Sequence, residues 1–262
     1  MNPITFVEPT DLGGALAALA HEPSARIIAG GSDLLAQLKD GRVEYGYLIS
    51  LDGLDALRGI EMDSAGLRIG ALTRLVDLER SPALTGPYRV LAEAARSVAT
   101  PEIRNQGTLG GNLCQRPRCL HYRHALVSCL KKGGEGCPAA ATPYQDYLSV
   151  FGGAGCYAVA PSELAPPLIA LDATVILESP RGRREMALES FFVGPDADPT
   201  RENVLADDEI VSAVSLPPIP TVPSRWRASY SKARERTAGD FAVVSAAIGY
   251  ELVDGRMRHV RL

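Results

Sequence analysis

The chain of 262 residues lacks several features that would place it in a common class of protein. It has no apolar stretch near the ~20 residues that span a bilayer, and its N-terminus lacks the basic segment and apolar core of a signal peptide. The formal net charge is only −4, so no basic field attracts nucleic acid. Five cysteines, an odd number, argue against a disulfide framework. We expect a cytoplasmic protein, or a periplasmic one if a partner with a signal exports it already folded.

Short motifs of several enzyme classes are also missing. No paired C-x₂₋₄-C knuckle of a zinc site is present, and no glycine run has the G-x-G-x-x-G spacing of a Rossmann fold. No nucleophile lies in the setting of a hydrolase elbow, and no internal repeat is visible. The chemistry must therefore be sought in two less common patterns, a pair of glycine turns and a group of cysteines.

Helix and strand patterns alternate along the first part of the chain. Apolar residues from Leu12 to Leu19 repeat at helical spacing, and a longer helix is expected from about 88 to 99. Residues 26–29, 47–51 and 156–160 are short apolar runs that predict buried strands. This order is typical of an α/β or α+β fold, and we take the chain as α+β.

The pattern changes near Pro180, after which only strands and turns are expected. We predict that these strands form one antiparallel sheet in a second domain, which divides the chain into residues 1–179 and 180–262. The strands expected in this sheet are 209–216, 226–232, 241–251 and 257–262.

Two glycine turns are candidate binding sites. Gly30-Gly31-Ser32-Asp33 joins a strand to a helix, where the backbone can approach a pyrophosphate closely. Thr108-Leu109-Gly110-Gly111-Asn112 would allow close approach of a flat ring. Each turn alone is more often structural, but two in one chain favour a dinucleotide with its phosphates at one turn and its ring at the other.

Most of the cysteines lie in one segment, residues 113–156, which has little periodicity and which we call the cysteine-rich segment. A structureless loop of this length is uncommon in a compact domain unless it is functional or pinned. Iron–sulfur clusters tolerate the wide spacings found here, and basic neighbours would favour thiolates. The alternative is a set of unrelated buried cysteines. The four candidates are Cys119, Cys129, Cys137 and Cys156.

These motifs together resemble the FAD-binding medium subunit of the xanthine dehydrogenase family of molybdenum hydroxylases. The resemblance covers essentially the whole chain. It implies a two-part FAD-binding domain of the vanillyl-alcohol-oxidase/molybdopterin-dehydrogenase type, followed by an antiparallel C-terminal domain. The matching stretches are Ile28–Leu35, Ile103–Asn112, Ser231–Arg234 and Asp240–Ala246.

The resemblance also implies which residues contact FAD. The first turn would wrap the pyrophosphate, the second would line the flavin and ribityl part, and a lysine from the C-terminal part would lie near the flavin. The residues implied are Ala29, Gly30, Gly31, Ser32, Asp33, Leu34, Thr100, Ile103, Asn105, Gly107, Thr108, Gly110, Gly111, Asn112, Ser162, Glu163 and Lys232.

The cysteine-rich segment is similar to a branch of this family, the bacterial aldehyde oxidoreductases, whose flavin subunit carries an additional [4Fe-4S] cluster. The ligands implied are the four cysteines named above. Two departures are notable. Cys114 stands where relatives carry an apolar residue, with no role evident, and the chain stops at Leu262 where relatives continue. We expect a shortened C-terminal domain or a part of a longer product.

The function that the resemblance implies is electron transfer within an oxidoreductase complex. A large partner subunit would oxidise the substrate at a molybdenum cofactor, and a small [2Fe-2S] subunit would pass electrons to FAD on this chain and onward to an external acceptor. Lys131 and Lys132, between two proposed ligands, are expected to raise the potential of the cluster. Two alternatives remain open: a stand-alone flavin oxidase or reductase, and a non-enzymatic cysteine-cluster redox scaffold.

Overall fold

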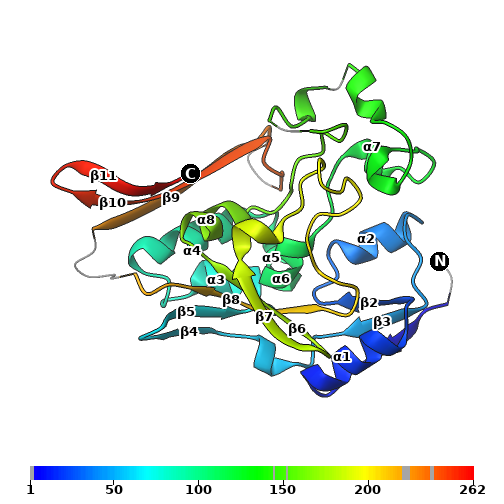
Figure 1. Cartoon of the computed structure of the whole chain (residues 1–262), viewed down its shortest axis with the longest axis horizontal. Coiled ribbons are helices and arrows are strands. Elements are labelled where there is room, and N and C mark those ends of the chain that lie inside the picture. Colours follow the sequence, from blue (N-terminus) through cyan, green and yellow to red (C-terminus); the bar gives the residue numbers. More distant parts are fainter. Residues whose placement is uncertain (1–2, 144, 152, 220–224, 237–238) are drawn as a thin grey trace.

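The computed structural model describes residues 3–143, 145–151, 153–219, 225–236 and 239–262. Strands in these residues form three sheets, and the cysteine-rich segment projects beyond α2 as irregular chain (Figure 1). No helix in the described residues combines the length and apolar character needed to cross a bilayer.

The N-terminal sheet is parallel, with strand order β1-β3-β2. Successive side chains of β3 point to opposite faces. Ile49 packs with the core on the α1 side, whereas Leu48 packs with Leu38 of α2. The predicted helix at 12–19 is confirmed, and Asp11 caps it by accepting a hydrogen bond from the Gly14 N–H at 2.7 Å. The elements are β1 (Thr5–Val7), α1 (Leu12–His21), β2 (Ala25–Ile28), α2 (Leu34–Lys39) and β3 (Tyr47–Ser50).

The largest sheet is antiparallel and has the order β4-β5-β8-β6-β7. The main hydrophobic core lies between this sheet and α3, α4 and α8. Its strands are β4 (Ile60–Asp63), β5 (Gly66–Gly70), β6 (Thr174–Ser179), β7 (Gly182–Ala187) and β8 (Ile210–Leu216). Five of the helices between β5 and β6 are α3 (Leu75–Arg80), α4 (Arg89–Ser97), α5 (Pro101–Gln106), α6 (Leu109–Cys114) and α8 (Ala165–Ala170), and another, α7 (Leu120–Arg123), belongs to the cysteine-rich segment.

One predicted strand pairing is wrong. Residues 209–216 were expected in the C-terminal sheet, but β8 lies between β5 and β6 in the large sheet. The strand is almost entirely buried, as befits a central strand, and its neighbours come from distant parts of the sequence. The large sheet therefore crosses residue 180, and the domain boundary there stays a prediction.

The C-terminal sheet is antiparallel, as predicted, with the order β11-β10-β9. Its strands β9 and β10 pack on α4 and α8 (Figure 1). β10 begins at Val244, later than expected, which leaves residues 241–243 outside the strand. The strands are β9 (Trp226–Ala233), β10 (Val244–Val253) and β11 (Arg256–Arg261).

The cysteine-rich segment is built from short turns, in agreement with its lack of periodicity. The strand expected at 156–160 is wrong: these residues pair with no strand in the described chain, although Cys156 is buried. A short apolar run can be buried in irregular chain as well as in a sheet. The helical pieces are α7 (Leu120–Arg123), η3 (Leu130–Lys132), η4 (Pro138–Ala141) and η5 (Gln145–Tyr147), with η1 (Asp55–Leu57), η2 (Gly86–Tyr88) and η6 (Leu188–Phe191) elsewhere.

Candidate cofactor sites

The first glycine turn, after β2, lies against the end of α5. Together with α6, which contains Gly110 and Gly111, it lines one cavity of about 800 Å³, which we call the glycine cavity. Gly30 makes this contact possible, because a Cβ atom there would lie 1.9 Å from the backbone oxygen of Gln106 at the end of α5. A residue with a side chain would force the first glycine turn away from the end of α5. Two features that are separate in the sequence therefore form one wall of one site.

Most of the residues implied by the family resemblance line this cavity. Asn105, Ser162, Glu163 and Lys232 are not among the described residues that line it, so their contact with a cofactor stays a prediction. The implied residues that do line it are Ala29, Gly30, Gly31, Ser32, Asp33, Leu34, Thr100, Ile103, Gly107, Thr108, Gly110, Gly111 and Asn112.

The first glycine turn presents free backbone donors. Gly31 has a φ of +70°, a conformation that glycine adopts without strain. The N–H groups of Gly30, Gly31 and Ser32 donate no hydrogen bond to any described residue. Backbone N–H groups in such a turn are suited to oxygen atoms of an anionic group.

The second predicted glycine turn, residues 108–112, is wrong as a turn, because the chain is helical from Leu109 onward and forms the start of α6. We keep the name second glycine turn for these residues, which side chains around them hold in place. Thr108 precedes α6, and its Oγ1 accepts a hydrogen bond from the Gly111 N–H at 3.2 Å. The buried Asn112 accepts through Oδ1 from the Ser162 hydroxyl at 2.8 Å. Its Nδ2 group donates to none of the described residues, and the residue lines the cavity. Ser162 therefore orients Asn112 from behind the wall.

Glu163 and Lys232 form a buried ion pair between the α8 region and β9. Their side chains are each 4% exposed, and Lys232 Nζ lies 2.6 Å from Glu163 Oε1. Lys232 also donates to the backbone oxygens of Ser97 at 2.7 Å and Asp240 at 3.0 Å. Burial raises the pKa of Glu163, and the lysine opposes that shift. The pair fixes residue 240, next to Phe241 on the cavity wall.

The Asp33 carboxylate faces the cysteine-rich segment. Arg123 Nη2 donates to its Oδ1 at 2.6 Å, Arg118 Nη1 lies 3.0 Å from the same oxygen, and the Arg116 N–H donates to Oδ2 at 2.9 Å. The guanidinium groups of Arg118 and Arg123 neutralise a carboxylate that would otherwise repel an anionic ligand at this turn. Arg118 also lies over the Phe241 ring, 4.7 Å from its centroid. Sequence inspection missed this network because no local pattern joins residue 33 to residues 116–123.

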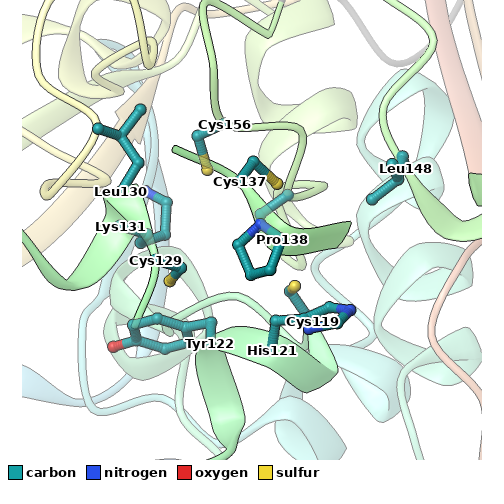
Figure 2. A pocket seen from close by; sticks show the side chains of 11 residues that line it. Cys119, His121, Tyr122, Cys129, Leu130, Lys131, Cys137, Pro138, Leu148 and Cys156 are labelled. Atoms are coloured by element: carbon teal, nitrogen blue, oxygen red, sulfur yellow. The ribbon is translucent and has the colours of Figure 1, made fainter. Parts of the chain in front are cut away.

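The four candidate cysteine ligands meet around one small cavity, which we call the cysteine pocket (Figure 2). Three of them precede a short helical turn: Cys119 precedes α7, Cys129 precedes η3 and Cys137 precedes η4. Cys156 lies in irregular chain, and burial raises the pKa of its thiol. All four are free thiols. The fold therefore gathers four residues that are widely spaced in the sequence.

The cysteine pocket is small. Its volume is about 10 Å³, whereas a water molecule needs a cavity of about 10–15 Å³. Among the described residues, no three cysteine, histidine or acidic side chains converge closely enough to hold a single metal ion. Four thiols fit the donor set of an iron–sulfur cluster, which is larger than one ion. A cluster would require the surrounding turns to move apart.

Lys131 lines the cysteine pocket but its charge is partly neutralised. The side chain is 8% exposed, and its Nζ donates to Glu202 Oε1 at 2.8 Å. Glu202 Oε2 in turn lies 2.9 Å from Arg116 Nε. Lys132 instead donates to the backbone oxygens of His124 and Val127, each at 2.5 Å. Lys131 thus binds a carboxylate and Lys132 binds backbone oxygens, a difference that their adjacent positions in the sequence do not reveal.

Cys114 lies apart from the other cysteines. It lines the glycine cavity at the end of α6, and burial raises the pKa of its thiol to about 12. A thiol with such a pKa stays protonated and unreactive near neutral pH. Its position on another cavity separates it from the four candidate ligands.

Comparison with known proteins agrees with this geometry. The "Aldehyde oxidoreductase FAD-binding subunit PaoB" of Escherichia coli (strain K12) is 37% identical over 250 residues, which cover 94% of this chain and 77% of that protein. The "Carbon monoxide dehydrogenase medium chain" of Hydrogenophaga pseudoflava is 27% identical over 255 residues, covering 97% of this chain and 71% of that protein.

Solved structures and a family match point the same way. A chain of the Hydrogenophaga pseudoflava carbon monoxide dehydrogenase that lacks the Mo-pyranopterin moiety superposes with a TM-score of 0.75 at 25% identity, over 99% of this chain and 73% of that one. Residues 2–219 match the family described as "FAD binding domain in molybdopterin dehydrogenase". This chain belongs to that family of FAD-binding domains of molybdopterin dehydrogenases.

Proposed function

We propose that this chain is the FAD-containing electron-transfer subunit of a molybdenum hydroxylase, and that its four gathered cysteines hold a [4Fe-4S] cluster. The observation that carries the proposal is that two distant glycine turns, inside an FAD-binding family, line one cavity of about 800 Å³. This volume is within the range of ~300–1,000 Å³ usual for small-molecule and cofactor sites.

The residues of the glycine cavity fit a dinucleotide. The free N–H groups of Gly30, Gly31 and Ser32 would hold its pyrophosphate, and the Asp33 charge nearby is neutralised by arginines. The second turn would meet the ring, with the Asn112 Nδ2 group free to donate to it. Bound FAD would supply the exchange between one-electron and two-electron transfer, while the protein orients it and adjusts its potential.

The cysteine pocket supports the cluster part of the proposal. Cys119, Cys129, Cys137 and Cys156 supply four sulfur donors to one space, which matches the Cys₄ ligand set of a cubane cluster. The buried Lys131 nearby would offset the negative charge of a cluster with four thiolates. Cys114, with its raised pKa and its place on the other cavity, is left out of the set.

Partner subunits complete the reaction in this proposal. The similar proteins are named as FAD-binding subunits or medium chains of larger oxidoreductases. We place the substrate site on a large molybdenum subunit and the [2Fe-2S] centres on a small subunit, from which electrons reach the flavin on this chain. An external acceptor then reoxidises the flavin.

The test is an anaerobic absorbance and EPR spectrum of the protein, as isolated and after dithionite, with flavin and iron assayed per chain. The proposal predicts about one FAD and about four irons. Cys129→Ser should lose the cluster signal, whereas the control Cys114→Ser should keep its iron. Flavin without iron would refute the cluster, and a folded protein with neither cofactor would refute both parts.

A further inference from the structure

The first glycine turn and the cysteine-rich segment are joined by one carboxylate. Asp33 immediately precedes α2 and lines the glycine cavity. Its two oxygens contact the guanidinium groups of Arg118 and Arg123 and the backbone N–H of Arg116, all in the cysteine-rich segment. Only Gln37, at 3.0 Å, contacts it from its own helix. The side chain is 17% exposed. A carboxylate committed in this way holds the segment in place.

The helix α7 carries this connection to the cysteine pocket. Cys119 is the residue before α7, and the Arg123 N–H donates to its backbone oxygen at 2.9 Å. The Arg123 side chain then binds Asp33, and also the backbone oxygens of Arg116 and Pro117. One turn of helix therefore separates a proposed cluster ligand from the residue that reaches the cavity.

Tyr122 on the same helix lines both cavities. The residue is 7% exposed, and the guanidinium of Arg116 lies 5.1 Å from its ring centroid. A displacement of the turns around the cysteine pocket would move this ring, and with it one wall of the glycine cavity.

A second connection runs parallel to the first. Lys131, which follows Cys129 by two residues, binds Glu202, and Glu202 binds Arg116. Both Glu202 and Arg116 line the glycine cavity. The two connections come from different cysteine turns and meet at the same wall.

We propose that Asp33 is a positioning residue that couples the two sites, so that loading the cysteine pocket with its cluster raises the affinity of the chain for FAD, and bound FAD stabilises the cluster. The inference rests on the proposed function. A cluster cross-links four turns of an otherwise irregular segment. It thereby removes conformational freedom that would let the residues of the cavity wall occupy several positions. Asp33 connects the ordered segment to the glycine cavity, because it holds Arg116 and Arg118, which line that cavity. Coupling between two binding sites is reciprocal.

The experiment is an anaerobic titration of the full chain with FAD, followed by quenching of flavin fluorescence. Iron-loaded protein and protein stripped of iron with a chelator are compared for the wild type, Asp33→Asn and the control Asp208→Asn. Asp208 is also bound by an arginine, Arg181, but does not line the cavity. Circular dichroism and an iron assay accompany each sample. Glu202→Gln, which cuts the second connection, serves as a further variant if Asp33→Asn does not fold.

We expect wild-type protein to bind FAD about tenfold more tightly when loaded than when stripped, within the usual range of coupling between sites. Asp208→Asn should keep this ratio, Asp33→Asn should bring it close to one, and Glu202→Gln should reduce it. Equal affinities of loaded and stripped wild type, or an unchanged ratio in the Asp33 and Glu202 variants, would refute the coupling alone. Protein that takes up no iron would refute the cluster and the coupling together.

Discussion

The glycine cavity and the cysteine pocket are built in opposite ways. The cavity lies among regular elements, and its shape is fixed by close contacts such as that of Gly30 with Gln106. The pocket lies in irregular chain and has a volume of about 10 Å³. The cavity is thus a property of the fold and is expected to exist without its ligand. The pocket gains its final shape only when a ligand cross-links it.

Lys232→Met should cause the largest loss of stability, and it should affect the part of the fold that supports the glycine cavity. Removing one partner of a buried ion pair leaves an uncompensated charge on Glu163, which costs about 3–5 kcal/mol of unfolding free energy. Denaturant unfolding measures this loss. The double variant Lys232→Met with Glu163→Leu should recover much of the lost stability. If Lys232→Met alone were as stable as the wild type, the ion pair would not be a buried, stabilising contact.

Gly30→Ala should abolish flavin binding while leaving iron in place. The added methyl group would overlap the Gln106 backbone, and the strain should lower stability by about 2–3 kcal/mol. Gly53→Ala is the matched control, since a Cβ atom there meets nothing within 4 Å. Flavin retained by the Gly30 variant at the wild-type level would show that the cavity does not depend on the close contact between the first glycine turn and α5.

Glu209→Gln tests the β8 side of the cavity through its pH dependence. Arg184 binds both carboxylate oxygens at 2.7 Å and holds the pKa of Glu209 below its ordinary value. The stability from this lowered pKa is present above the unfolded-state pKa and is lost as the pH falls through the folded-state pKa. We expect the variant to be less stable by about 1–2 kcal/mol at pH 7, with a smaller difference below about pH 4. A pH-independent difference would contradict this.

Lys131→Gln should have the smallest effect, confined to the cysteine pocket. Loss of a buried positive charge should move the midpoint potential of the cluster to a more negative value. Glu202→Gln should move it the other way, because the lysine charge is then no longer neutralised. Lys132→Gln serves as control, since that side chain binds backbone oxygens and does not line the pocket. Redox titration followed by EPR measures the midpoint potential of the cluster in the three variants. Equal potentials in Lys131→Gln and the wild type would show that Lys131 does not adjust the potential.

Local features of the sequence predicted the parts of both sites that depend on local structure. Helical spacing predicted α1, and the two glycine pairs marked segments that line the glycine cavity, although the second pair lies in α6 and not in a turn. Local patterns could not predict which strands pair when the strands are far apart in the sequence. The position of β8 between β5 and β6 depends on strands far away in the chain.

The contacts of charged and polar side chains could not be predicted from the sequence either. Asp33 looked like part of a phosphate turn, and only the fold shows the arginines around its carboxylate. Ser162 likewise supports Asn112 from behind the cavity wall instead of lining it.

The most direct test of this account is the ratio of flavin to iron in three proteins, measured anaerobically at saturating FAD. The wild type should hold about one FAD and four irons per chain. Cys129→Ser should keep its FAD and lose its iron, and Gly30→Ala should keep its iron and lose its FAD. If either variant lost both cofactors while still folded, or lost neither, the separation of a preformed flavin cavity from a ligand-shaped cysteine pocket would be contradicted.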